Sequence, residues 1–327
     1  MSEFISGVPS YTLNTGAVMP AVGLGTFGSD KYSADQIAAA VSGAVKAGYR
    51  MLDCASVYQN EDQIGKVLDG LFKEGVVKRE DLFITSKVWN DQHREVRKAC
   101  EKSLKDLGLD YIDLYFVHWP FPNYHAPGCD GDSRNPDSKP FSVDEFMDTW
   151  EQLEELYDAG LVKAIGMSNM TIAKLERVLP LCRIMPAALE MECHPSFQQQ
   201  SLFDYAKSKG IVPIGFCPIG SPSRPERDRT DTDVADTELP EVIEVSKNHG
   251  VHPALICIKW AVQRGMCTIP FSVKEPQYIS NLKCTTEDPL TAEEMELLKK
   301  AERDCRLVKG QVFLWPGAKD WTQLWSG

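Results

Sequence analysis

The sequence lacks the features that mark secreted and membrane-spanning proteins. None of its 10 cysteines forms a C-x-x-C pair, so we expect free thiols rather than a disulfide framework, and no metal site. No apolar run approaches the roughly 20 residues that a membrane helix needs. Residues 1–10 lack the charged and apolar regions of a signal peptide. Together these absences predict a cytoplasmic protein with no membrane partner.

Positive charge is also scarce. The chain has 35 Lys and Arg residues against 47 Asp and Glu residues, which gives a formal net charge of −12 over 327 residues. Nucleic acids attract clustered cations, so this composition argues against a nucleic-acid partner. The acidic residues are spread along the chain and leave no obvious partner surface, so we expect a monomer or a weak homo-oligomer.

Short apolar segments alternate with amphipathic segments, with one such unit in about 30 residues. The apolar segments carry hydrophobic residues on both faces, which is typical of a buried parallel sheet. Eight such units predict a (β/α)8 TIM barrel, one α/β domain over residues 1–327, with an N-terminal hairpin and an aromatic C-terminal tail. The predicted strands are 21–26, 51–53, 82–86, 112–117, 162–166, 188–192, 212–216 and 267–270. The predicted helices include 62–72, 171–178, 201–208, 239–248, 253–264 and 291–304.

A glycine pattern offers a competing interpretation. Gly23, Gly25 and Gly28 satisfy G-x-G-x-x-G after a predicted strand, and Asp53 ends the next strand. That arrangement is typical of a Rossmann dinucleotide site. In a Rossmann site the last glycine lies where the helix begins, yet the predicted capping box begins only at Ser33. The count of eight units therefore favours the barrel.

Four polar residues follow three consecutive predicted strands. Asp53 and Tyr58 follow the second strand, Lys87 ends the third and His118 ends the fourth. The carboxyl ends of parallel barrel strands meet on the face that carries the chemistry. A Lys–Asp pair can also merely neutralise a barrel mouth, and a buried His is often structural. The four together favour a functional site.

These side chains suit the reduction of a carbonyl group. Hydride addition to a carbonyl places negative charge on its oxygen, which then needs a proton donor. Tyr58 would be the general acid, and the nearby Lys87 ammonium would lower the pKa of the phenol. Asp53 would hold Lys87 charged, and His118 would orient the carbonyl oxygen.

The sequence resembles the aldo-keto reductases from about Tyr11 to Arg306. The resemblance rests on six segments: 53–61 (DCASVYQNE), 84–89 (ITSKVW), 113–120 (DLYFVHWP), 166–169 (GMSN), 192–195 (ECHP) and 269–272 (IPFS). It implies a barrel that binds NADPH, NADH or both without a Rossmann domain. It also implies a catalytic tetrad of Asp53, Tyr58, Lys87 and His118.

The same resemblance implies the residues that contact the cofactor. Ser168 and Asn169 should bind the nicotinamide carboxamide. Glu190 stands where the family usually has Gln, and a carboxylate there can accept from the amide N–H. Phe216 should stack on the nicotinamide ring. The remaining predicted cofactor contacts are Gly25, Thr26, Ser221, Phe271, Ser272, Lys274 and Asn281.

The adenosine end of the predicted site departs from the family pattern. Members that prefer NADPH typically carry a Lys and an Arg where this chain has Phe271 and Gln277. Two cations that would neutralise a 2′-phosphate are therefore absent, although Lys274 remains and can bind phosphate as a point charge. We expect weak discrimination, with NADH used beside NADPH.

Aromatic residues are expected to line the substrate pocket. They are Phe27, Trp89, Trp119 and Trp315. The expected activity is the reduction of small aldehydes or aldoses by an NAD(P)H-dependent oxidoreductase. Two other hypotheses are a regulatory protein that binds the cofactor with little turnover, and a lyase that uses Lys87 as a Schiff-base nucleophile.

Overall fold

Eight parallel strands form the centre of the fold. The computed structural model describes residues 4–28, 31–122, 135–220, 222, 224 and 229–326. Every strand of the eight-stranded sheet pairs with the next in chain order. The strands are β3 (Leu24–Gly25), β4 (Met51–Asp53), β5 (Phe83–Val88), β6 (Leu114–Val117), β7 (Ile165–Ser168), β8 (Ala188–Glu192), β9 (Val212–Phe216) and β10 (Cys267–Thr268).

Backbone hydrogen bonds join the first strand to the last and close the sheet into a ring. Val22 forms a parallel bridge with Thr268. The amide of Gly23 donates to the Thr268 carbonyl at 2.9 Å, and the amide of Gly25 donates to the Pro270 carbonyl at 3.1 Å. A Cβ at position 25 would lie 2.9 Å from the Ile269 carbonyl oxygen, so glycine permits this close approach.

A hairpin covers one end of the ring. It consists of the antiparallel strands β1 (Ser10–Thr12) and β2 (Val18–Pro20). Leu13 and Met19 are buried in one apolar cluster with Met51 and Leu114 of the barrel strands. The predicted N-terminal hairpin is therefore confirmed, and it packs against the barrel interior.

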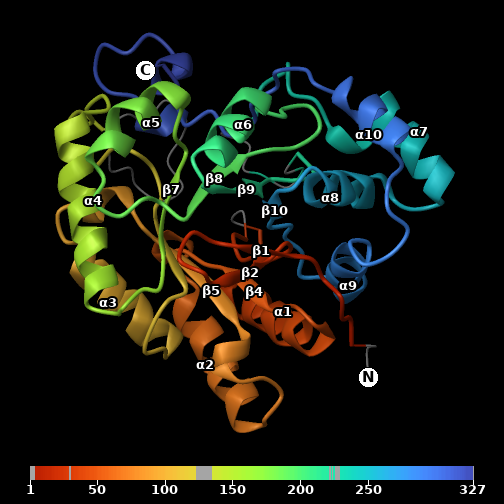
Figure 1. Cartoon of the computed structure of the whole chain (residues 1–327), viewed down its shortest axis with the longest axis horizontal. Coiled ribbons are helices and arrows are strands. Elements are labelled where there is room, and N and C mark those ends of the chain that lie inside the picture. The colour runs from red at the N-terminus through yellow and green to blue at the C-terminus, as the bar shows by residue number, and fades with distance from the viewer. Residues whose placement is uncertain are drawn as a thin grey trace.

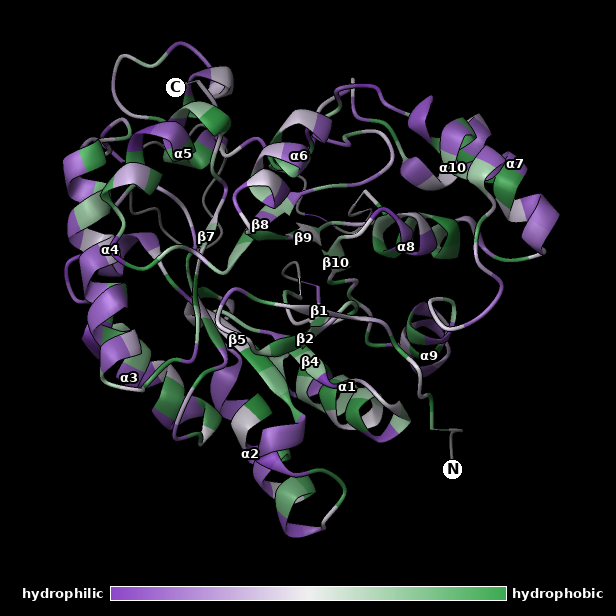
Figure 2. Ribbon diagram, viewed as in Figure 1, coloured by the Kyte–Doolittle hydropathy of each residue, from purple (hydrophilic) through white to green (hydrophobic). Residues whose placement is uncertain are grey.

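Helices surround the strands on the outside (Figure 1). In Figure 2 the outward faces of the helices are mostly hydrophilic, while the strands are largely hydrophobic. α1 begins with the predicted capping box, in which Ser33 and Gln36 satisfy each other's backbone amides. The helices are α1 (Ala34–Ala47), α2 (Glu61–Lys73), α3 (Val96–Leu107), α4 (Val143–Asp158), α5 (Ile172–Val178), α6 (Gln200–Ser208), α7 (Pro240–His249), α8 (Pro253–Gln263), α9 (Glu275–Lys283) and α10 (Ala292–Lys299).

The predicted (β/α)8 barrel is confirmed, and the Rossmann interpretation is wrong because α1 begins at Ala34, beyond Gly28. Several predicted boundaries also differ from the observed ones, and two examples show the size of the differences. The last helix ends at Lys299, because the amides of Arg303 and Cys305 donate to the Ser196 carbonyl instead of continuing the helix. The strand predicted at 162–166 is displaced to Ile165–Ser168. Within the described residues, no helix is both long and apolar enough to span a bilayer.

Candidate active site

Asp53 and Lys87 form a fully buried ion pair between two neighbouring strands. Lys87 Nζ, on β5, donates to both carboxylate oxygens of Asp53, on β4, at 2.7 Å. It also donates to the Cys54 carbonyl at 3.1 Å. Thr85, also on β5, donates to Asp53 Oδ1 at 2.6 Å. The carboxylate is therefore fixed by two side chains that lie on the same face of β5.

Tyr58 lies in a short 3₁₀ helix, Ser56–Tyr58, which directly follows β4. Its ring centre is 5.4 Å from Lys87 Nζ. The loop is held by buried hydrogen bonds: Thr26 Oγ1 donates to the Asp53 carbonyl at 2.8 Å, and Asn60 Nδ2 donates to the Thr26 carbonyl at 2.8 Å. Predicted residue Thr26 thus positions the segment that carries Tyr58.

His118 follows β6, the strand next to the one that carries Lys87. Its ring forms T-shaped contacts with two aromatic rings, with centroid distances of 5.8 Å to Tyr58 and 4.9 Å to Trp89. The side chain is buried. The structure therefore brings together all four residues that the sequence predicts as a tetrad, although their catalytic roles stay a prediction.

Burial and charge set the protonation of this cluster. Burial alone would lower the pKa of Lys87, but Asp53, Glu190 and Tyr58 raise it above its ordinary value. Burial and the Lys87 charge hold the pKa of His118 well below its ordinary value. At neutral pH, Lys87 is therefore an ammonium ion and His118 a neutral imidazole that can donate one hydrogen bond.

The pKa of Tyr58 departs from the prediction. Lys87 does lower it, as expected, but burial outweighs that effect, and the charges of Asp53 and Glu190 add to the burial. The net result is a pKa above the ordinary value of a phenol. The expectation of a lowered pKa is thus wrong for the isolated protein, and the phenol is protonated at neutral pH.

The residues predicted at the carboxamide lie at the end of β7, beside this cluster. Asn169 adopts a left-handed conformation with φ of 58°. Its Nδ2 donates to the His118 carbonyl at 2.9 Å and to Ser168 Oγ at 3.1 Å. Its Oδ1 is buried and has no hydrogen-bond partner within the described part of the chain. This oxygen is available to accept from an amide N–H.

Glu190, on β8, lies next to the same residues. It pairs in register with Ser168, and the Asn169 amide donates to its carbonyl at 3.0 Å. Its side chain is buried, with Oε2 3.5 Å from Lys87 Nζ. That oxygen also lacks a hydrogen-bond partner among the residues described.

The other predicted cofactor contacts lie at the ends of β3 and β9 or in the segments after β9 and β10. Phe216 ends β9 and is half-buried, with its backbone paired to Glu192. Ser272 and Asn281 are buried. Ser272 Oγ donates to Gln277 Oε1 at 2.7 Å and accepts from the Lys274 amide at 3.0 Å. Gly25 pairs in register with Asp53. The ring centroid of Phe271 lies 5.7 Å from that of Tyr32. Ser221 is outside the described residues.

The predicted pocket aromatics divide into two groups. Phe27 is 40% exposed, with its ring 5.2 Å from that of Tyr58. Trp89 contacts His118 and therefore also borders the tetrad. Trp119 is buried against Phe313 of the C-terminal tail at 4.6 Å. Trp315 lines a cavity of about 110 Å³ beside Lys174 and Leu324, so its place in a substrate pocket stays a prediction.

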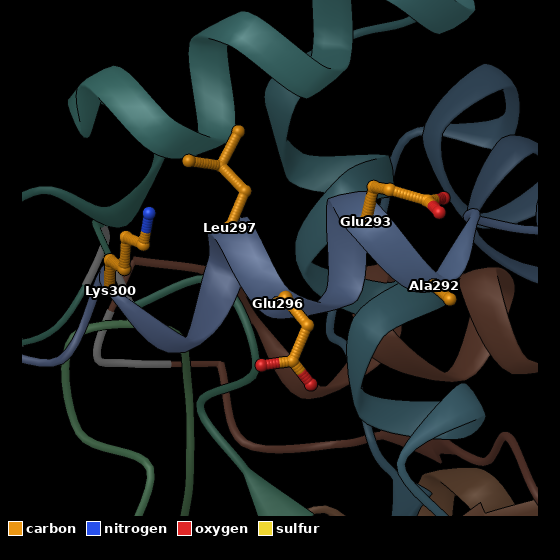
Figure 3. Close-up of a pocket in the computed structure, with 5 residues that line it drawn as sticks. All are labelled: Ala292, Glu293, Glu296, Leu297 and Lys300. Carbon is orange, nitrogen blue, oxygen red and sulfur yellow. The ribbon is translucent and has the colours of Figure 1, made fainter.

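A larger hollow lies on the outside of the protein. It has a volume of about 340 Å³ and runs along one side of α10, where Leu297 points toward a neighbouring helix and Glu293 and Glu296 point in other directions (Figure 3). Its lining contains none of the predicted site residues. The hollow therefore offers no rival to the tetrad as the centre of the chemistry.

Sequence analysis missed a second buried ionic cluster, which lies beneath the C-terminal segment. His194 Nε2 is 2.9 Å from Glu192 Oε1, and His194 Nδ1 is 2.9 Å from Asp236 Oδ2. Glu192 also accepts from the amides of Leu307 and Val308 at 2.7 and 3.0 Å. The ECHP segment could have suggested the Glu–His pair, but nothing in the sequence pointed to Asp236.

Comparison with known proteins gives one consistent answer. The Aldo/keto reductase family matches residues 21–303. An aldo/keto reductase of Synechocystis sp. is 38% identical over 98% of both chains. The NADP-dependent D-sorbitol-6-phosphate dehydrogenase of Malus domestica is 36% identical, over 90% of this chain and 94% of its own length.

A solved structure agrees with these sequence relatives. The Bombyx mori aldo-keto reductase in complex with NADP superposes with a TM-score of 0.81 and 29% identity. The match covers 93% of this chain and 96% of the other. The barrel, the tetrad geometry and these matches therefore agree, and the chain belongs to the aldo/keto reductase family.

Proposed function

We propose that this protein is an NAD(P)H-dependent oxidoreductase that reduces small aldehydes or aldoses to alcohols. One observation carries the proposal: Lys87, held by Asp53, lies beside Tyr58 and next to the strand that ends at His118. This places a phenol, an ammonium and an imidazole on one face of the barrel. That set can donate a proton to a carbonyl oxygen while its charge develops.

Unpaired polar atoms beside the tetrad fit a nicotinamide. Asn169 Oδ1 and Glu190 Oε2 are buried, and neither has a hydrogen-bond partner within the described residues, although Glu190 Oε2 lies 3.5 Å from Lys87 Nζ. A carboxamide has two N–H donors, which would satisfy such acceptors. Phe216 would supply an aromatic face, and Ser272 and Asn281 would hold the adenosine end. The cofactor of the Bombyx mori relative supports NADP as one form.

The proposed mechanism divides the work among the four side chains. The cofactor, when bound, supplies the hydride to the carbonyl carbon. Tyr58, which is protonated at neutral pH, donates its proton to the carbonyl oxygen as that oxygen gains charge. Neutral His118 donates a hydrogen bond that orients the oxygen. Lys87 stabilises the resulting phenolate, and Asp53 orients Lys87.

The alternatives are less compatible with these residues. A Schiff-base lyase needs an unprotonated Lys, whereas Asp53 and Glu190 raise the pKa of Lys87. A regulatory protein without turnover would not require the intact tetrad. Phe27 and Trp89 next to the tetrad favour a small substrate with an apolar contact surface. The name of the Malus domestica relative supports polyols and sugars as candidates.

A substrate panel tests this proposal. Simple aldehydes, aldoses and uronates are each mixed with NADPH or NADH, and the loss of absorbance of the reduced cofactor is followed. We expect turnover with at least one class and with both cofactors. If no carbonyl compound were reduced although the cofactor binds, the regulatory alternative would replace the proposal.

A further inference from the structure

Glu190 is a second carboxylate beside the Lys87 ammonium and forms a longer ion pair with it than Asp53 does. Lys87 Nζ donates to the two Asp53 oxygens at 2.7 Å and to the Cys54 carbonyl at 3.1 Å, so its nearest acceptors are these and not Glu190. Glu190 Oε2, 3.5 Å away, lacks a hydrogen-bond partner in the part of the chain described. Leaving a buried carboxylate oxygen without a hydrogen bond is costly even near an ammonium ion, so this arrangement suggests a further interaction.

The groups around Glu190 make its own charge decisive. It faces Asp53 on β4, Tyr58 after β4, Lys87 on β5 and Cys267 on β10. Asp53 and Lys87 cancel each other, while burial raises the pKa of both Tyr58 and Cys267 and keeps them neutral. The cluster is therefore neutral when Glu190 is protonated and carries one negative charge when Glu190 is ionised.

Glu190 titrates in a useful range. Burial and the charge of Asp53 raise its pKa to about 8, although Lys87 opposes them. Both forms of Glu190 are thus accessible near neutral pH. Its position also matters, because Ser168 pairs with it in register and the Asn169 amide donates to its carbonyl. These two residues are the ones expected at the nicotinamide carboxamide.

On the basis of the proposed function, we propose that the charge of Glu190 sets the relative affinity of this site for the oxidised and reduced cofactor. The oxidised nicotinamide carries a positive charge, and the reduced nicotinamide is neutral. An ionised carboxylate beside the ring favours the oxidised form, whereas the protonated acid does not distinguish the two by charge. Glu190 is thus a positioning and selectivity residue, and it takes no part in the proton transfer from Tyr58.

Two consequences follow from linkage between cofactor charge and proton binding. Binding of the oxidised cofactor displaces a proton from Glu190 near neutral pH, whereas the reduced cofactor leaves that proton in place. In the direction of carbonyl reduction, the oxidised cofactor is released more slowly as the pH rises. The overall equilibrium in solution is unchanged, because only the occupancy of the site depends on Glu190.

Titration of the whole protein with each cofactor form tests the proposal. The dissociation constants of NADP⁺, NADPH, NAD⁺ and NADH are measured by calorimetry in the wild type and in Glu190→Gln. The measurements run from about pH 6 to about pH 9.5, which brackets the titration. Glu296→Gln, an exposed change on α10, is the matched control. Buffers of different ionisation enthalpy report the number of protons released.

In the wild type, we expect the dissociation constant of the oxidised cofactor, divided by that of the reduced cofactor, to fall about tenfold as the pH rises. The reason is the attraction between unit charges in a partly buried site. Glu296→Gln should show the same fall. Glu190→Gln should give a flat ratio and no proton release, with affinity for the reduced form changed by less than about twofold.

Other outcomes would overturn this inference. A ratio of dissociation constants that does not change with pH in the wild type would contradict the inference, even if Glu190→Gln failed to fold. A Glu190→Gln variant whose ratio still falls with pH would contradict it too. If Glu190 only supported Lys87, the variant would lose turnover or thermal stability while the ratio kept its slope. Absence of binding by either cofactor form would instead contradict the proposed function.

Discussion

The side-chain amide of Asn169 donates a 2.9 Å hydrogen bond to the backbone carbonyl of His118. This bond connects the end of β7 to the end of β6. It also fixes the orientation of the amide, so that Oδ1 is left as a buried acceptor. A residue expected to hold the cofactor is therefore tied to a residue expected to orient the substrate.

Replacement of Asn169 by Gly tests that connection. Gly accepts the positive φ of this position, so the backbone stays unstrained while both amide interactions are lost. We expect the dissociation constant of NADPH to rise about fivefold to tenfold, the value of one hydrogen bond. Fluorescence titration measures it. Asp304→Gly, at another left-handed position, is the control and should bind NADPH like the wild type.

The Tyr58→Phe variant tests the proton donor. It removes the hydroxyl group but keeps the ring that contacts Phe27 and His118. We expect turnover to fall by about 100-fold to 10,000-fold, the usual contribution of a general acid. Cofactor affinity should stay close to that of the wild type. A variant with nearly normal kcat would show that another group donates the proton.

The sequence was sufficient to predict the barrel and the convergence of the tetrad, and the physical reason is geometric. Parallel strands in a barrel end on one face, so Asp53, Lys87 and His118 had to meet once their strands were recognised. Thr85 could have been added, because it lies two residues before Lys87 and so shares its face of β5.

Other properties depend on burial and distant contacts, which the local sequence does not contain. The net pKa of Tyr58 is set mainly by desolvation, so a neighbouring Lys87 was not enough to predict its direction. The position of Trp315 depends on how the tail folds over Lys174, which donates to the Leu324 carbonyl at 2.9 Å. The early end of α10 depends on Ser196, a residue far away in the chain.

The Asp53→Asn variant tests the stability of the buried ion pair. The change removes the nearer ionic partner of the fully buried Lys87 ammonium and leaves only Glu190, whose Oε2 lies 3.5 Å away. We expect the free energy of unfolding in urea to fall by about 3 kcal/mol. Asp69→Asn, which breaks the exposed pair with Lys73, should cost less than about 1 kcal/mol. Equal effects of the two changes would mean that burial does not strengthen the first pair.

Cofactor preference follows from the residues at the adenosine end. Gln277 is occupied by its hydrogen bond from Ser272, and Phe271 offers no charge. We expect kcat/KM for NADPH to exceed that for NADH by less than about 1000-fold. The double change Phe271→Lys and Gln277→Arg should shift the preference toward NADPH by about tenfold or more. A wild-type preference above that limit would contradict the interpretation, as would a double variant without a shift.

His194 connects the barrel to two other segments through charge. Its side chain is fully buried between Glu192, which holds the backbone of the C-terminal segment, and Asp236, which precedes α7. Burial alone would lower the pKa of His194, but Asp236 and Glu192 together raise it to about 9. At neutral pH the imidazolium ion is therefore the form that links these segments.

The pH dependence of stability tests this link. In the unfolded chain the pKa of a histidine is about 6.5, so the ion pairs contribute fully below that pH. As the pH rises through about 9, the folded protein loses the same proton and the contribution disappears. We expect the loss to reach about 3 kcal/mol of unfolding free energy in urea.

The His194→Gln variant tests the assignment to this group. It should be less stable than the wild type at pH about 6, and its free energy of unfolding should fall less between that pH and pH about 9.5. His252→Asn, which keeps an N-cap acceptor for α8, should follow the wild type. If His194→Gln lost as much as the wild type, the linkage would lie in another group.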